Sequence, residues 1–118
     1  MINQYEADRL LKETITELSD KNYPSNPSLV IYATITYFSD YTKNALTIRN
    51  VDQITKSFEL AENLYLHGDK IVRALIEDSF IFSVSAIMSH GMTDLLFLKA
   101  TAPDTLYQLY KKHLLTIN

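Results

Sequence analysis

The chain has 118 residues, which is enough for one domain whose core needs no disulfide or metal to hold it together. Hydrophobic residues make up 47% and charged residues 21%, a balance typical of folded globular proteins and not of disordered chains. The net charge of -3 and the lack of any basic run disfavour nucleic acid as a partner. Cysteine is absent, which excludes disulfides and thiolate metal sites.

The sequence also disfavours secretion and membrane insertion. The segment from Met1 to Leu10 holds charged residues and no apolar signal core. The longest apolar-rich stretches are Leu29–Phe38 and Phe80–Met88. Each is about half of the roughly 20 residues that a bilayer-spanning helix needs. We therefore expect a cytoplasmic protein without membrane contact.

Helices are favoured throughout, because two glycines and three prolines are too few for a hairpin-rich β protein. The first helix is predicted over Gln4–Asp20. Asn3 and Glu6 have the spacing of a capping box, in which each side chain accepts a backbone N–H from the other residue. Apolar residues then recur every three or four positions, until the pattern breaks around Pro24.

The second helix is predicted to start at Asn26-Pro27, since asparagine is a good N-cap and proline is tolerated in the first turn. No breaker follows before Leu46. Its first half, Leu29–Phe38, is β-branched and aromatic and would also fit a buried strand. We prefer a helix, because the cap is good and no hairpin partner is evident.

A third helix is predicted over Val51–His67, where Asn50 and Gln53 have capping-box spacing. Gly68 follows at the position where a helix end favours a left-handed residue. Asp69 is expected to cap a fourth helix that reaches Ser89 and is apolar on nearly all sides near its end.

A short helix over Met92–Lys99 and a last one beginning near Thr101–Asp104 complete the prediction. Connections of one to six residues favour antiparallel neighbours. The predicted fold class is therefore all-α. We expect residues 1–118 to form a single domain, either a bundle or a short helical-hairpin array of five to six helices.

The sequence carries no recognisable catalytic chemistry. Only Gly68 and Gly91 are available, so phosphate-cradling loops are absent. No E-x-x-H motif of helical di-metal sites occurs, and Glu59 with Glu62 is interpreted as a solvated helix face. We predict no catalytic, cofactor-binding or metal-binding residue, and favour a protein that is not an enzyme.

Tyrosine is the enriched residue, with eight copies and no tryptophan. Its large ring and polar tip are common in protein interfaces, although most tyrosines lie at the edge of a core. We predict a partner-binding surface where acidic side chains and tyrosine combine on the third helix and its end. Its residues are Glu59, Glu62, Tyr65, His67 and Asp69. The acidic pair Glu13 and Glu17 is the alternative surface.

The stretch from Phe58 to Ile81 resembles a small family of uncharacterised bacterial all-helical proteins with the pattern A-E-x-L-Y-x-x-G-D-x-x-V-x-x-A-I. The pattern corresponds here to Ala61, Glu62, Leu64, Tyr65, Gly68, Asp69, Val72, Leu75 and Ile76. Its later alanine is met at Ala74 only by a one-residue shift. The resemblance implies a cytoplasmic bacterial protein without known catalytic residues, of a partner-binding or immunity type that covers its target with an acidic surface.

Two alternatives remain open. A small metal- or ligand-dependent enzyme would bring His67, His90 or Glu62 together in one concave pocket. A self-associating domain would expose an apolar patch and form a homodimer. The favoured hypothesis is a domain that binds an unidentified protein partner, in an immunity-type or regulatory role.

Overall fold

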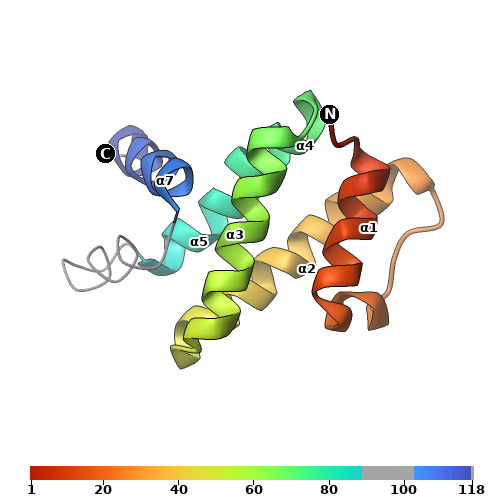
Figure 1. The fold of residues 1–118 in the computed structure, drawn as a ribbon, viewed down its shortest axis with the longest axis horizontal. Helices are drawn as coiled ribbons and strands as arrows, with labels where there is room; N and C mark the ends of the chain where they lie inside the picture. Colours follow the sequence, from red (N-terminus) through yellow and green to blue (C-terminus); the bar gives the residue numbers. More distant parts are fainter. Residues whose placement is uncertain (89–102, 118) are drawn as a thin grey trace.

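The computed structural model describes residues 1–88 and 103–117 (Figure 1). In chain order the elements are α1 (Gln4–Thr14), the 3₁₀ helix η1 (Thr16–Asp20), α2 (Pro27–Ile48), α3 (Val51–His67), α4 (Lys70–Leu75), the π turn η2 (Ile76–Phe80), α5 (Ile81–Met88) and α7 (Asp104–Ile117). These ranges hold no β-strand, which confirms the all-α prediction. The short helix predicted over Met92–Lys99 lies outside the described residues.

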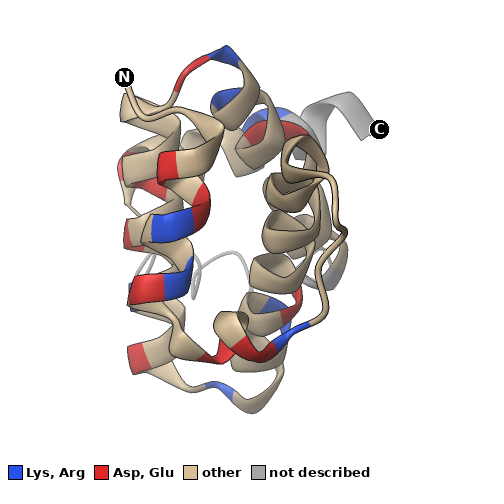
Figure 2. Cartoon of the chain, turned by 90° about the vertical axis from the view of Figure 1, so that its right-hand side faces the viewer, with Lys and Arg blue, Asp and Glu red and all other residues tan. Residues whose placement is uncertain are grey.

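The helix α2 is the centre of the molecule and passes behind α1 and α3 in Figure 1. It packs against α1, α3, η2 and α5. Residues Leu29–Phe38 belong to it, so the strand alternative is wrong. The Asn26 side chain accepts the Ser28 N–H at 3.0 Å and Pro27 opens the first turn, as the cap predicted. In Figure 2 coloured bands recur along α1, whereas α2 is almost entirely tan, because Asp40 and Lys43 are its only charged residues.

An aromatic cluster joins α2, α3 and η2 in the core. Phe38 stacks on Phe80, with ring centroids 4.7 Å apart and planes 15° from parallel. Phe58 meets Phe80 edge-on at 6.5 Å and 89°. All three are at most 2% exposed. Such pairs contribute about 0.5–1.5 kcal/mol each beyond the burial of their area.

The first helix ends earlier than its pattern predicted. Both hydrogen bonds of the Asn3–Glu6 capping box are present, but α1 stops at Thr14. Ile15 is extended (φ −118°, ψ 91°), and η1 then turns Leu18 back into the core. The β-branched run Thr14-Ile15-Thr16 has low helix propensity, which weakens the helix at this point.

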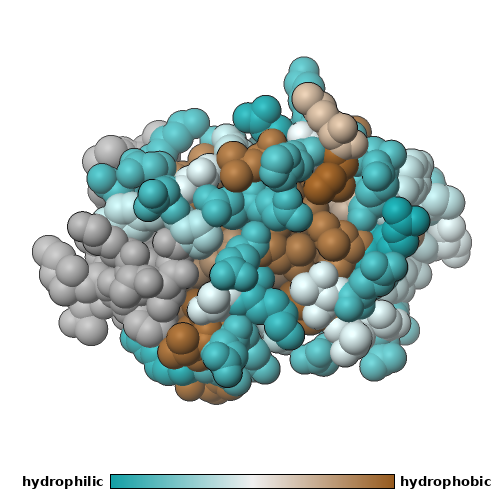
Figure 3. Space-filling model, in the orientation of Figure 1, coloured by the Kyte–Doolittle hydropathy of each residue, from teal (hydrophilic) through white to brown (hydrophobic). Residues whose placement is uncertain are grey.

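The turn between α2 and α3 contains the left-handed residue that ends a helix. Arg49 has φ 58°, and the Asn50 N–H donates to the carbonyl of Ala45 at 3.0 Å. The Asn50 side chain caps α3 through the Gln53 N–H, which is one half of the predicted capping box, whereas the Asn50 N–H is taken by Ala45 and not by the Gln53 side chain. Ile48 and Val51 on either side are 58% and 51% exposed, and brown atoms lie at this corner in the lower left of Figure 3.

Gly68 is not left-handed, contrary to its prediction. It is extended (φ −75°, ψ 156°), and Ile2 pairs with this linker through two backbone hydrogen bonds of 2.7 and 2.8 Å. A Cβ at Gly68 would lie 2.3 Å from the Leu64 carbonyl oxygen and 2.6 Å from Val72 Cγ1. The position needs glycine because the Leu64 carbonyl oxygen and the Val72 side chain leave no room for a Cβ, whatever its φ angle.

The elements α4, η2 and α5 form one continuous helix from the predicted Asp69 cap. Four of its buried side chains, Val72, Ile76, Phe80 and Val84, recur every four residues, and Ile81 and Ser85 are buried beside the last two. Each such step overshoots the 3.6-residue α-helical turn by about 40°, so a regular helix would turn the stripe away from the core. A π turn holds more residues than an α-helical turn, so η2 compensates for this extra rotation. The four buried side chains therefore stay on the side of the helix that faces the core.

Candidate functional site

Two of the five residues predicted for the partner-binding surface cap helices. The Asp69 side chain accepts the Val72 N–H at 3.0 Å and so begins α4. A Glu62 oxygen accepts the Thr105 N–H at 3.2 Å, in the first turn of α7. Both carboxylates are partly buried, and their geometry is explained by helix starts that need an acceptor.

The other three predicted residues lie on different parts of the surface. Tyr65 carries the Arg73 guanidinium over its ring at 5.1 Å and lines a hollow together with Arg73 and Gly68. His67 lines a separate hollow beside Met1 and Ile2. Glu59 is exposed on α3. The five residues are therefore neighbours in sequence and do not line one common cleft, and partner binding by them stays a prediction.

The histidines do not define a metal centre in the described residues. His67 is exposed, whereas His90 and the side chain of His113 lie outside what the structure describes. Across the described ranges, no group of three histidine, aspartate or glutamate side chains is placed to hold a metal ion. The pocket that the enzyme alternative requires would include His90, so that alternative stays untested.

Several tyrosines are explained by contacts within the chain. A cation lies over the ring in the pairs Lys12–Tyr23, Lys21–Tyr37, Arg73–Tyr65 and Lys111–Tyr107, at 3.9, 5.9, 5.1 and 5.5 Å from the ring centroids. Cation–π contacts of this kind are favourable by about 0.5–1 kcal/mol at exposed sites. A surplus of tyrosine is thus a weak indicator of an interface in this protein.

A cleft of about 410 Å³ separates η1 from the middle of α2. It is lined by Glu17, Leu18, Lys21, Tyr37, Asp40, Tyr41 and Asn44. The four residues from α2 are spaced at i, i+3, i+4 and i+7, which places them on one face of the helix. The cleft exists because η1 folds back over this face after α1 has ended.

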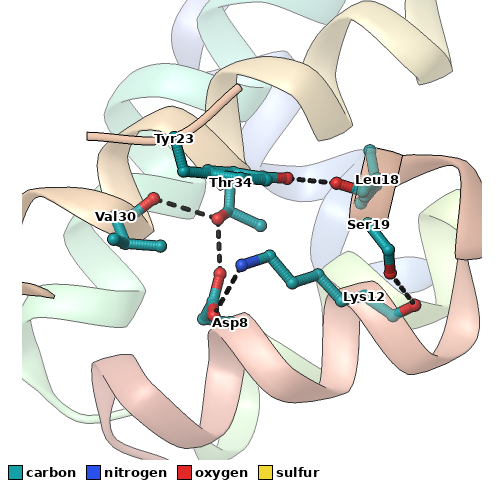
Figure 4. Close-up of polar contacts among 7 residues, drawn as sticks. All are labelled: Asp8, Lys12, Leu18, Ser19, Tyr23, Val30 and Thr34. Carbon is teal, nitrogen blue, oxygen red and sulfur yellow. Dashed lines mark hydrogen bonds and ion pairs between the residues drawn. The ribbon is translucent and has the colours of Figure 1, made fainter. Parts of the chain in front are cut away.

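A polar cluster next to the cleft joins α1 to α2 (Figure 4). The Thr34 hydroxyl donates to one oxygen of Asp8, and the second Asp8 oxygen pairs with Lys12 at 3.1 Å. The Lys12 ammonium also lies over the Tyr23 ring. The side chains of Asp8 and Lys12 are only 21% and 25% exposed, so this pair is screened less than a surface pair.

The same cluster fixes the wall of the cleft. The Tyr23 hydroxyl donates to the Leu18 carbonyl of η1 (Figure 4). Its ring meets Tyr37 edge-on at a centroid distance of 5.4 Å, and the Tyr37 hydroxyl donates to the Asn22 carbonyl at 2.8 Å. Tyr37 is thereby held from two directions, which orders the ring before any ligand arrives.

Charges of both signs line the cleft, from the carboxylates of Glu17 and Asp40 and the ammonium of Lys21. Burial raises the pKa of Tyr41, and the Glu17 carboxylate raises it further, so the phenol stays neutral at physiological pH. Among the described residues, the one hydrogen bond that Glu17 accepts is a long one of 3.4 Å from the adjacent Thr16 hydroxyl. Asp40 pairs with Lys43 at 3.3 Å, and that aspartate side chain is 60% exposed. Two carboxylates and two phenol rings thus face one cleft.

Sequence reasoning identified only part of this cleft. Glu17 belongs to the alternative acidic surface, but Tyr37, Asp40 and Tyr41 were not assigned to any site. Their common face on α2 was readable from their spacing. The sequence did not show that η1 covers this face, because η1 forms where the predicted first helix is interrupted.

Comparison with protein families finds a match to a family described as Domain of unknown function (DUF7674), over residues 8–116. No curated protein and no solved structure matches the chain. Within the described ranges, no helix is both long enough and apolar enough to cross a membrane.

Proposed function

The chain belongs to the DUF7674 family, a domain of unknown function, and we propose from its surface chemistry that it is a protein-binding domain. The cleft between η1 and α2 would receive a lysine or arginine side chain of a partner protein. The observation that carries the proposal is the meeting of Glu17, Tyr37, Asp40 and Tyr41 at one cleft. A carboxylate attracts a cation, and a phenol ring offers it a negative face.

The cleft has the size and order that such a ligand needs. Its volume of about 410 Å³ falls in the usual range for small-ligand sites, so it accommodates one long side chain. Tyr37 is held by Tyr23 and by the Asn22 carbonyl. A wall ordered in advance reduces the entropy lost on binding.

The cations already near the cleft are weakly held and can be exchanged. Lys21 lies 5.9 Å from the Tyr37 centroid, at the outer limit of about 6 Å for a cation–π contact. Lys43 forms an exposed pair with Asp40, and such pairs contribute about 0–1 kcal/mol. An incoming arginine that contacts Glu17 and a ring together would therefore displace little stabilising energy.

This chemistry agrees with an immunity-type or regulatory role in a bacterial cytoplasm, where a mildly acidic protein covers a basic surface of its target. The lack of cysteine is compatible with that compartment. The residues predicted on α3 and its end (Glu59, Glu62, Tyr65, His67 and Asp69) remain the competing surface. Glu59 is exposed there, which makes it a suitable comparison for Glu17.

A peptide pair tests the proposal directly. A short arginine-containing peptide and its neutral citrulline counterpart are titrated into the protein and followed by fluorescence anisotropy. We expect the arginine peptide to bind more tightly, and Glu17→Gln to weaken its binding about tenfold, equivalent to roughly 1.4 kcal/mol. The matched variant Glu59→Gln is expected to leave binding unchanged. Equal affinity for both peptides would contradict recognition of a cation. If Glu59→Gln alone weakened binding, the binding surface would lie on α3 and not at the cleft.

A further inference from the structure

A second surface, away from the cleft, lies where α4 meets the beginning of α2. A hollow of about 320 Å³ is lined there by Tyr32, Lys70, Ile71, Ala74, Leu75 and Asp78. Ile71 and Tyr32 are 43% and 48% exposed, and Leu29, one turn before Tyr32, is 49% exposed. The surface thus has an apolar middle with a charge at each end, the arrangement of a small protein interface.

Tyr32 differs from the tyrosines that carry a cation. Within the described residues its ring has neither a cation nor another ring against it, although nearly half of its surface faces solvent. An exposed tyrosine beside Ile71 and Ala74 offers contact area that the fold itself does not use. Tyrosine is among the residues that contribute most at interfaces.

The charges on this helix are arranged so that the surface complements itself. Lys70 and Asp78 are both exposed, and neither forms an ion pair with another described residue. Ala74 lies midway, four residues from each. A two-fold axis at Ala74 would therefore set Lys70 of one copy opposite Asp78 of the second copy, and the reverse pair at the other end. A two-fold interface requires this kind of self-complementarity.

We propose that the chain forms a homodimer through this surface, with the α4 helices of two copies antiparallel and crossing at Ala74. The small Ala74 side chain lets the two backbones approach, as small residues do wherever helices pack closely. Tyr32 and Leu29 extend the apolar contact on each side. The patch comprises seven residues, fewer than the roughly 20–30 residues a side of a standard interface, so the dimer dissociates on dilution.

Charge exchange gives a test that a non-specific contact would fail. Lys70→Glu sets like charges opposite each other at both ends of the dimer, and so does Asp78→Lys. Mixing the two variants restores an attractive pair at each end. The new glutamate of one copy then faces the new lysine of the other, and the native Asp78 faces the native Lys70. Sedimentation velocity between about 10 µM and 1 mM, a range that detects weak dimers, measures each sample.

We expect the unaltered chain to dimerise, each variant alone to lose at least tenfold in dimer affinity, and their mixture to recover it. Ala74→Arg, which fills the crossing point, is expected to abolish association. A chain that stays monomeric at about 1 mM, or a mixture that does not recover, overturns the proposal. Far-UV circular dichroism checks folding, and Ile71→Ser tests the same surface without a charge change. Glu17→Gln is expected not to affect the dimer, so failure here leaves the cleft proposal standing.

Discussion

At the scale of single residues, Gly68 has no room for a side chain. We expect Gly68→Ala to lower the free energy of unfolding by about 1–3 kcal/mol, the usual cost of overpacking. The cause is the Leu64 carbonyl oxygen and Val72 Cγ1, which would lie 2.3 and 2.6 Å from the new Cβ. Its φ of −75° suits alanine, and such a substitution in open space would instead stabilise by about 0.4–1 kcal/mol. Urea denaturation shows whether Gly68→Ala lowers or raises the free energy of unfolding.

A double variant relieves part of the clash at Gly68. Val72→Ala removes the Cγ1 atom that a new Cβ would meet at 2.6 Å, but leaves the Cβ of residue 72 at 2.8 Å and the Leu64 carbonyl oxygen at 2.3 Å. We expect the double variant to be less destabilised than the sum of its single changes, the signature of coupled neighbours. A Gly68→Ala protein more stable than the parent would refute the close-packing explanation.

Tyr41 gives the protein a dependence on alkaline pH. Burial, with a further effect of Glu17, raises its folded pKa above the ordinary value of about 10. A raised folded pKa contributes stability that is present below the unfolded pKa and is lost as pH rises through the folded one. The pKa of Tyr23, raised mainly by burial, and that of Lys112, raised by its hydrogen bond to Glu77, act in the same direction. We expect the urea midpoint to fall as pH rises from about 9 to 11.

Replacing Tyr41 by phenylalanine isolates its share of that fall. The ring stays and the ionisable hydroxyl is removed, so Tyr41→Phe should lose less stability than the parent over the same pH interval. Tyr5, which is 57% exposed, supplies the control substitution Tyr5→Phe, whose slope should match that of the parent. Identical slopes for the parent and Tyr41→Phe would contradict the argument.

At the scale of elements, the π turn explains the four-residue spacing of Val72, Ile76, Phe80 and Val84. Deleting the half-buried Ser79 changes that spacing to four, three and four, which suits a regular α-helix. We expect this deletion to keep the helix and most of the stability. Deleting the exposed Lys56 from α3, which has no π turn, rotates all later core residues by about 100° and should unfold the protein. Circular dichroism during heating compares the thermal stability of the two deletion variants. An equal loss of stability in both would show that the π turn η2 does not explain the four-residue spacing.

Local signals predicted the positions of most elements. The side chains of Asn3, Asn26, Asn50 and Asp69 all cap helices as expected, and they settled α2 as a helix despite its strand-like composition. The predictions that are wrong concern positions whose conformation is determined by tertiary packing. Ile15 leaves the helical conformation and Gly68 is compressed between two helices, and neither packing partner is visible in a pattern of single residues.

At the scale of the whole molecule, the cleft shows why the site was harder to predict than the fold. The face of Tyr37, Asp40 and Tyr41 follows from helical periodicity, but its partner Glu17 is brought to it by η1. That placement depends on contacts between residues far apart in sequence, including the bond from Thr34 to Asp8. The acidic residues predicted together on α3 and its end were grouped by sequence distance, and two of them serve as helix caps.

Recognition of a basic side chain by the cleft between η1 and α2 can be observed residue by residue. The most direct measurement is a nuclear magnetic resonance titration of the labelled protein with the arginine peptide, observing backbone amides and tyrosine rings. We expect the largest shifts at Glu17, Tyr37, Tyr41 and Asn44, and we expect them to disappear in Glu17→Gln. Shifts concentrated on α3 around Glu59 and Tyr65, or spread evenly over all acidic residues, would contradict recognition at the cleft.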